Sequence, residues 1–165
     1  MKLNNCLNRI LFNKEQRVKN QGELIDKYNS ALLSLTINIP GATKLSDDSK
    51  YIYEVALQEL KNLGLKELDQ ILTSNEAGCE ALICVEIDAI KLKTLTSKIE
   101  ENHPLGRFMD IDVIDKNKQI LSRKIPRKCY ICETNAKECA RSQKHALKEL
   151  LDHISTKVHD YKTSI

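Results

Sequence analysis

The sequence of 165 residues contains no tryptophan and only two phenylalanines. A protein that stacks nucleic-acid bases on aromatic side chains would have few residues for that task. The excess of positive charge is also small: 26 Lys and Arg residues stand against 23 Asp and Glu residues, which leaves a net charge of +3. So small a charge does not indicate a nucleic acid or an anionic membrane as partner. We therefore expect neither of them.

Long apolar segments are missing as well. Nowhere do about 18 apolar residues follow one another, as a membrane-spanning helix requires, and the first six residues do not begin the apolar core of a signal peptide. We expect a cytoplasmic protein whose six cysteines stay reduced. With 41% hydrophobic and 30% charged residues, the chain is expected to form one folded domain over residues 1–165.

The spacing of apolar residues predicts an α+β fold. Helices are expected at about 5–28, 46–63, 88–99 and 137–159, the first with a break near 20–22; strands are expected at 31–39, 69–73, 81–87 and 108–114, with 119–122 as a hairpin partner of the last one. The central order is β-α-β-β-α-β, which is typical of ferredoxin-like folds with a mostly antiparallel sheet. The core would cover about 31–122, followed by a Cys/His turn and a helix over about 127–159.

Two carboxylates stand out on the strand predicted at 108–114. Side chains alternate along a strand, so Asp110 and Asp112 share one face while Met109, Ile111 and Val113 point to the other. Adjacent carboxylates repel each other unless a cation lies between them, and hard oxygen ligands suit Mg²⁺. The alternative interpretation is the solvated face of an amphipathic strand.

A basic segment follows directly. Six Lys and Arg and no acidic residue occur from 116 to 128, so 26 − 6 = 20 basic residues remain against 23 acidic ones elsewhere. Cations beside a metal-binding carboxylate pair are what a triphosphate requires. A solubilising loop, or a docking surface for an acidic protein, would have the same composition.

Three thiols and an imidazole form a second group, Cys129-x2-Cys132-x6-Cys139-x5-His145. Zinc is commonly held by such a Cys₃His set, and the C-x2-C half has the usual spacing. The alternatives are buried thiols beside a surface histidine and, with less support from the flanking residues, a C-x2-C redox pair.

Several motifs together resemble the holo-citrate lyase synthase family, apo-citrate lyase phosphoribosyl-dephospho-CoA transferase. The matching segments are His103–Val113 (HPLGRFMDIDV), Asn38–Gly41 (NIPG), Arg127–Cys132, Cys139–Arg141 with His145, and Glu149–Leu151. They occur in the family's order over almost the whole chain.

The resemblance implies a nucleotidyltransferase. Its donor would be 2'-(5''-triphosphoribosyl)-3'-dephospho-CoA, its acceptor a serine of the citrate lyase acyl carrier subunit (gamma chain), and its by-product diphosphate. Asp110 and Asp112 would hold Mg²⁺, and Arg107 would act with them. The expected substrate-binding residues are Asn38, Gly41, Gly106, Arg123, Arg127 and Arg141, and a structural zinc would use Cys129, Cys132, Cys139 and His145.

Two other functions remain compatible with the sequence. One is an equivalent transferase for the carrier protein of malonate decarboxylase. The other is a zinc-containing assembly factor that binds the carrier protein without catalysis. Diphosphate release in the presence of donor and carrier distinguishes an enzyme from a binding protein.

Overall fold

The structure is a computed structural model that describes the backbone of residues 2–123 and 125–165, and the side chains from residue 8 onward within those ranges. The elements are α1 (Lys2–Tyr28), β1 (Ala31–Ile37), α2 (Asp47–Asn62), β2 (Glu67–Asn75), β3 (Gly78–Val85), α3 (Ala89–Asn102), a 3₁₀ turn (Gly106–Phe108), β4 (Met109–Ile114), α4 (Ala136–Arg141) and α5 (Leu147–Ser164). The strands form one sheet in the order β2-β3-β1-β4, and every neighbouring pair is antiparallel. The predicted α+β class is confirmed, and this order is that of a ferredoxin-like sheet.

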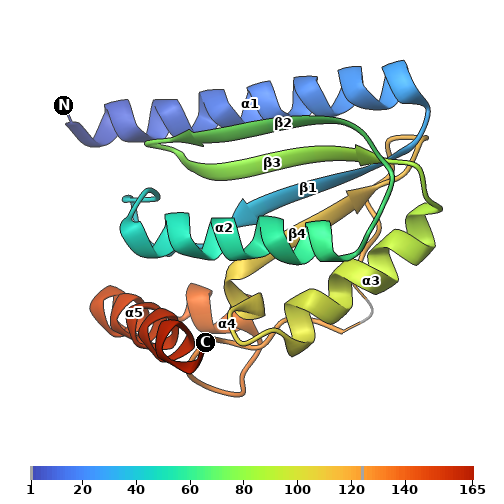
Figure 1. The fold of residues 1–165 in the computed structure, drawn as a ribbon. Coiled ribbons are helices and arrows are strands. Elements are labelled where there is room, and N and C mark those ends of the chain that lie inside the picture. The colour runs from blue at the N-terminus through green and yellow to red at the C-terminus, as the bar shows by residue number, and fades with distance from the viewer. Residues whose placement is uncertain (1, 124) are drawn as a thin grey trace.

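Helices cover both faces of the sheet (Figure 1). The larger core lies between the sheet and α2, α3 and α5, where Leu35, Ile52 and Ile111 are completely buried. A smaller core lies under α1, where Leu24 and Ile25 pack on Leu32 and other side chains of the opposite face. Of the described helices, none is at once long and apolar enough to cross a bilayer.

The first helix runs without interruption to Tyr28, so the break expected near 20–22 is wrong. A glycine inside a helix costs about 1 kcal/mol relative to alanine. Packing of Leu24 and Ile25 against the sheet offsets that cost around Gly22. Gln21 also donates a 3.0 Å hydrogen bond from Nε2 to Ser34 Oγ of β1.

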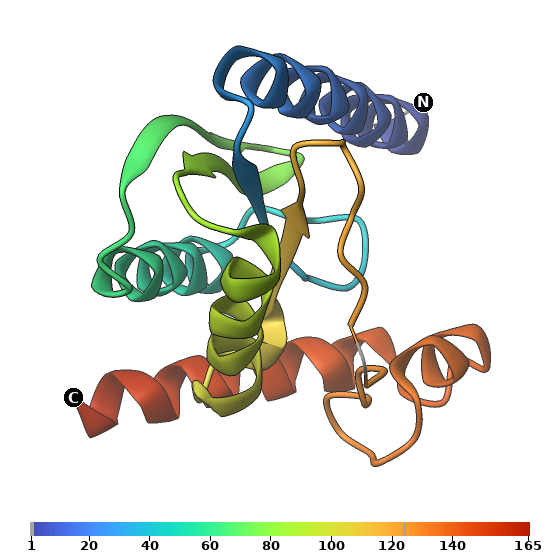
Figure 2. The ribbon, with the colours of Figure 1, turned by 90° about the vertical axis from the view of Figure 1, so that its right-hand side faces the viewer.

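The strand expected at 119–122 does not form within the described residues. Only Leu121 pairs with β4 through a backbone hydrogen bond, 2.9 Å from its N to Val113 O, beside an isolated bridge between Ile114 and Ile120. Side chains of α3 and of Arg127 occupy the outer edge of β4 in place of a fifth strand. The segment nevertheless returns alongside β4 before it reaches α4 (Figure 2).

The C-terminal helix expected over 137–159 is two helices. The helix α4 ends at Arg141, and Gln143 adopts a left-handed backbone with φ of 48°. Lys144 N then donates back to Cys139 O at 3.3 Å, so the chain reverses before α5 begins. The reversal brings Lys144 back to Cys139 of α4 and His145 to Cys132.

Gly106 provides a test of how tightly α3 packs on the turn before β4. A Cβ at this position would overlap Ile99 O and lie 2.7 Å from Glu100 O, both of the α3 backbone. We expect Gly106→Ala to lower the free energy of unfolding by about 1–3 kcal/mol, measured by urea denaturation. In the control Gly22→Ala the new methyl meets only Lys118 Nζ at 3.9 Å. That control should be neutral or slightly stabilising, and equal losses in both variants would contradict the packing argument.

Candidate functional site

Asp110 and Asp112 lie on the edge strand β4 and face the side of the sheet that α1 covers. Ile111 between them is completely buried in the opposite core. Across the strand pair, Asp110 stands opposite Thr36 and Asp112 opposite Ser34 of β1. The two carboxylates therefore share one face, as the alternation of the strand predicted.

The surroundings of Asp112 disfavour its negative charge. Asp112 is exposed as a residue, but protein atoms surround its carboxyl group and partly desolvate it. This desolvation, and then repulsion from the Asp110 carboxylate, raises the pKa of Asp112. Lys93 and two arginines oppose the shift without cancelling it. A divalent cation shared by the two carboxylates would remove the repulsion.

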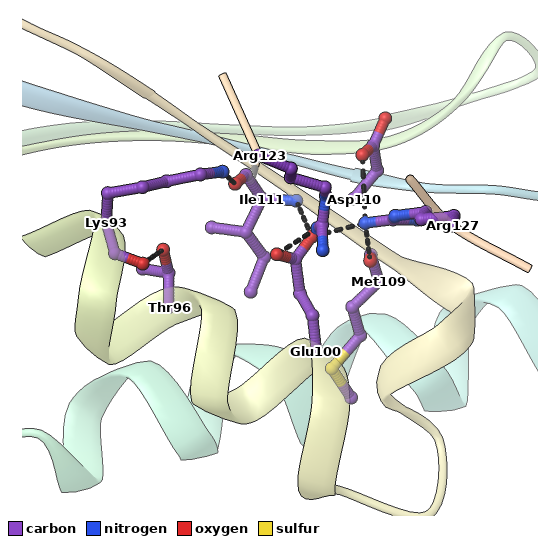
Figure 3. Close-up of polar contacts among 8 residues, drawn as sticks. All are labelled: Lys93, Thr96, Glu100, Met109, Asp110, Ile111, Arg123 and Arg127. Atoms are coloured by element: carbon purple, nitrogen blue, oxygen red, sulfur yellow. Dashed lines mark hydrogen bonds and ion pairs between the residues drawn. The ribbon is translucent and has the colours of Figure 1, made fainter. Parts of the chain in front are cut away.

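A buried ionic cluster lies at the outer edge of β4 (Figure 3). Glu100 of α3 forms ion pairs with Arg123 and Arg127, and its side chain is only 2% exposed. Arg127 also donates to Met109 O at 2.8 Å and lies 3.0 Å from Asp110 Oδ1. One guanidinium thus joins the carboxylate pair to the buried glutamate.

A large cleft beside α4 and α5 has a volume of about 640 Å³, which is within the usual range for small-molecule sites. Its polar walls hold Asn38, Gly41, Arg107, Arg127 and His145, and its apolar walls include Tyr130, Ala140, Leu147 and Leu150. Two arginines on one wall and aliphatic side chains of α4 and α5 on another suit a ligand with anionic and apolar parts.

A smaller hollow of about 230 Å³ lies between α1 and the sheet. It is lined by Asp110 and Thr36, by Arg17 of α1 and by Lys44, among others. Asn38, which follows β1, lines both the cleft and the hollow. The contact between Arg127 in the cleft and Asp110 in the hollow joins the two spaces.

Tyr130 is held in the wall of the large cleft by contacts with its neighbours. Its hydroxyl donates to Asn38 O at 2.9 Å, and Phe108 meets its ring edge-on with centroids 5.2 Å apart. Arg107 lies over the same ring, 5.7 Å from the centroid. Burial raises the pKa of Tyr130 to about 12, so the hydroxyl keeps its proton and its hydrogen bond at neutral pH.

The Cys₃His group converges in space. The ligand atoms of Cys129, Cys132, Cys139 and His145 all lie within 4.8 Å of one another. Cys139 Sγ is 3.4 Å from Cys129 Sγ and 3.9 Å from Cys132 Sγ, and His145 Nε2 is 3.3 Å from Cys132 Sγ. Tetrahedral zinc with Zn–S bonds of about 2.3 Å separates its sulfurs by about 3.8 Å. The group is therefore a possible metal site whose spacing is near that geometry.

The reversal between α4 and α5 creates this convergence, because it returns His145 to Cys139 instead of carrying it along one helix. Two hydrogen bonds lower the pKa of Cys132 to about 5: the one with His145 has the larger effect, and the one with Thr134 the next largest. Metals bind the thiolate form of cysteine. Cys129, Cys139 and His145 also line the large cleft, so this group forms part of its wall.

Comparison with known proteins places these residues in a family. The family model described as apo-citrate lyase phosphoribosyl-dephospho-CoA transferase matches residues 5–161. The chain belongs to this family. A "Probable apo-citrate lyase phosphoribosyl-dephospho-CoA transferase" of Vibrio cholerae is 38% identical, over 94% of this chain and 92% of the relative. The transferase of Citrobacter koseri is 33% identical over 94% and 89%. "Protein CitXG" of Haemophilus influenzae is 34% identical, over 96% of this chain but 36% of its own length.

Three of the six expected substrate-binding residues lie outside the cleft and the hollow. Gly106 is buried against α3, which explains the glycine by packing. Arg123 points to Glu100, and Arg141 is exposed on α4. The structure brings together Asn38, Gly41, Arg107, Arg127, Asp110 and the Cys₃His group. Asp112 stands beside them on β4 without lining either space.

Glu100 was missed by the sequence analysis of this transferase. A signal for it existed, because Lys93 and Glu100 are one helical repeat of seven residues apart and lie beside Leu92 and Ile99 on the buried stripe of α3. Charged residues on such a stripe are almost never buried unless they are paired. Tyr130 gave no comparable signal.

Proposed function

We propose that this protein transfers the phosphoribosyl-dephospho-CoA group of 2'-(5''-triphosphoribosyl)-3'-dephospho-CoA to a serine of the citrate lyase acyl carrier subunit and releases diphosphate. The observation that carries the proposal is the junction at Arg127, where an arginine-lined cleft meets the Asp110/Asp112 strand in a member of this family. A phosphoryl-type transfer needs groups that neutralise a polyphosphate and carboxylates that hold a metal ion, and the arginines of the cleft and the carboxylate pair would supply them.

In the proposed reaction the serine Oγ bonds to the phosphorus nearest the ribose. The bond from that phosphorus to the bridging oxygen breaks, and diphosphate leaves with the electron pair. The serine proton would pass to a carboxylate, for which Asp112 on β4 is the candidate. Arg107 and Arg127 neutralise charge on the phosphoryl oxygens.

The carboxylate pair fits Mg²⁺, since two oxygen ligands on one strand face are available and their mutual repulsion favours a bound cation. Asp110 and Asp112 would hold the ion. When bound, the ion would screen the charge of the triphosphate and orient it for in-line attack.

The cleft suits the dephospho-CoA part of the donor. Its arginines would face phosphates, and Leu147 and Leu150 would cover the pantetheine arm. Gly41 has a left-handed backbone with φ of 82° and packs against Leu147, so the loop after β1 can approach a ligand closely with its backbone. The serine would reach Asp110 through the smaller hollow.

We also propose zinc in the Cys₃His group, with a structural role. A set of three thiols and one imidazole closes a tetrahedral site without an open position. Zinc there would hold the segment 129–145 as one wall of the donor cleft. Free thiols of this kind persist in a reducing compartment, which favours the cytoplasm as the place of action.

The carrier protein would dock through Lys116. Other cations of the basic segment have acidic partners: Lys118 binds Asp26, Lys128 binds Glu133, and Arg123 and Arg127 bind Glu100. Lys116 is exposed, and no acidic partner approaches it among the residues that the structure describes. Its charge is therefore available to an acidic carrier surface.

The reaction is tested by incubating donor, Mg²⁺ and the carrier subunit with the protein. We expect the carrier mass to rise by the transferred group and diphosphate to appear in equal amount. Asp110→Asn and Asp112→Asn should each lower the rate by about a hundredfold or more, because they remove charge that the transition state needs. Asp152→Asn, at an exposed position of α5, is the control. Carrier binding without diphosphate release would identify a non-catalytic binding protein.

Metal content tests the zinc proposal. We expect about one zinc per chain by mass spectrometry of the metals in the purified protein, and Cys132→Ser or a strong chelator should remove it and lower the melting temperature. Cys84→Ala is the matched control, because this buried core cysteine lies outside the group and should affect stability alone. A metal-free protein with a disulfide between Cys129 and Cys132 would contradict the proposal and support the C-x2-C redox pair.

Kinetics test the docking site. Lys116→Glu should raise the KM for the carrier severalfold, more at low salt than at high salt, because an exposed charge acts through screened electrostatics. The KM for the donor should stay the same. Lys157→Glu on α5 is the control, and an unchanged carrier KM in Lys116→Glu would remove this residue from the docking surface.

A further inference from the structure

Glu100 lies at the point where three separate parts of the chain meet. It belongs to α3 and accepts a 2.9 Å hydrogen bond from Ile111 N of β4. Its carboxylate also holds Arg127 and Arg123, which come from the segment after β4 (Figure 3). The side chain of Glu100 is 2% exposed, whereas those of Arg127 and Arg123 are 16% and 21% exposed. The glutamate is thus the buried end of the cluster and the arginines are its outer part.

Covering the edge of β4 does not by itself explain this glutamate. Lys93, also on α3, donates to Ile111 O at 3.0 Å, so the two α3 side chains together satisfy both backbone groups of Ile111. Burial raises the pKa of Glu100, while the Ile111 amide and the two arginines oppose the shift. Burying an ion pair costs desolvation energy that a neutral hydrogen-bonding side chain would avoid. The charge therefore calls for a role beyond the backbone contact.

The contacts of Arg127 indicate that role. Its contacts with Glu100, Met109 O and Asp110 all use one nitrogen, Nη2. No protein group bonds its Nη1 or Nε among the residues that the structure describes, while the side chain lines the large cleft. An arginine held at Nη2 keeps its Nη1 and Nε hydrogens available, and each of these nitrogens can donate to a phosphate oxygen in the cleft.

We infer that Glu100 is a positioning residue for the transfer reaction: it fixes Arg127 so that the guanidinium nitrogens that no protein group bonds donate to a phosphate of the donor beside Asp110. The inference rests on the proposed function, because it presupposes a phosphorylated donor in the cleft. Glu100 itself does not line the cleft and acts only through Arg127. Arg127 and Glu100 should consequently behave as one unit in kinetics.

The test uses Glu100→Gln, which keeps an acceptor for Ile111 N but removes the charge that holds Arg127. We expect the KM for the donor to rise by about tenfold or more, because misplacing a binding group has effects of this order, while the KM for the carrier stays unchanged. Arg127→Gln should give a similar donor KM, and the double variant should be little worse than either single variant. A merely structural role would reduce the active fraction, and hence kcat, without changing either KM.

Lys93→Met is the matched control, because it removes the other α3 contact to Ile111 and does not touch Arg127. It should change stability and leave the donor KM as in the wild type. A raised donor KM in Lys93→Met, or additive effects of Glu100→Gln and Arg127→Gln, would overturn the inference. If Glu100→Gln does not fold, Glu100→Asp keeps the charge but withdraws it by one methylene, and a normal donor KM in that variant would overturn the inference as well. Absence of any transfer by the wild-type protein would instead refute the proposed function.

Discussion

The open edge of β4 is the constraint on which the site depends. A strand at the margin of a sheet exposes unpaired backbone groups, and a protein has to cover them or risk pairing with another chain. Here no fifth strand forms among the described residues, and the groups are satisfied by Lys93, Glu100 and Arg127 instead. Because that cover consists of charged side chains, it also brings a cation next to Asp110. Arg127 therefore serves both purposes: it covers part of the edge of β4 and belongs to the candidate site.

The Cys₃His group forms another part of the cleft wall, and this part does not depend on the edge of β4. The segment from Cys129 to His145 carries the four side chains and has little regular structure. The short helix α4, which contains Cys139, is its one helix. A metal ion bound by three thiols and an imidazole, as proposed above, would hold such a segment where a hydrophobic core is too small. His145 directly precedes Ala146 and Leu147, and all three line the cleft, so the group and the start of α5 form adjoining parts of its wall.

Much of the fold follows from the sequence. The alternation around Asp110 and the helical stripe of Ile52, Ala56 and Leu60 reflect burial on one face, which a local pattern records. The extent of α1 and the loss of a strand at 119–122 depend on contacts with distant residues, such as Ser34 for the helix and Lys93 for the edge of β4. No local pattern contains that information.

The same distinction applies to the site. Motif order selected Arg107, Arg127 and the Cys₃His group, which the fold brings to one cleft. It also selected Gly106, and the basic segment suggested Arg123; their neighbours are the α3 backbone and Glu100. A motif can contain residues that pack against the rest of the fold as well as residues that touch a ligand. Only three-dimensional contacts separate the two kinds.

The hollow beside α1 has a consequence for the acceptor. With a volume of about 230 Å³, bounded by the helix on one side and by Asp110 and Thr36 on the other, it admits a side chain and a short piece of backbone but no folded surface. A hydroxyl of the proposed acceptor that reaches Asp110 by this route would have to project from an exposed loop or a loosened helix end. Acceptors would then be distinguished by how far their residue protrudes, and a serine lying flat on a protein surface would be excluded by reach alone.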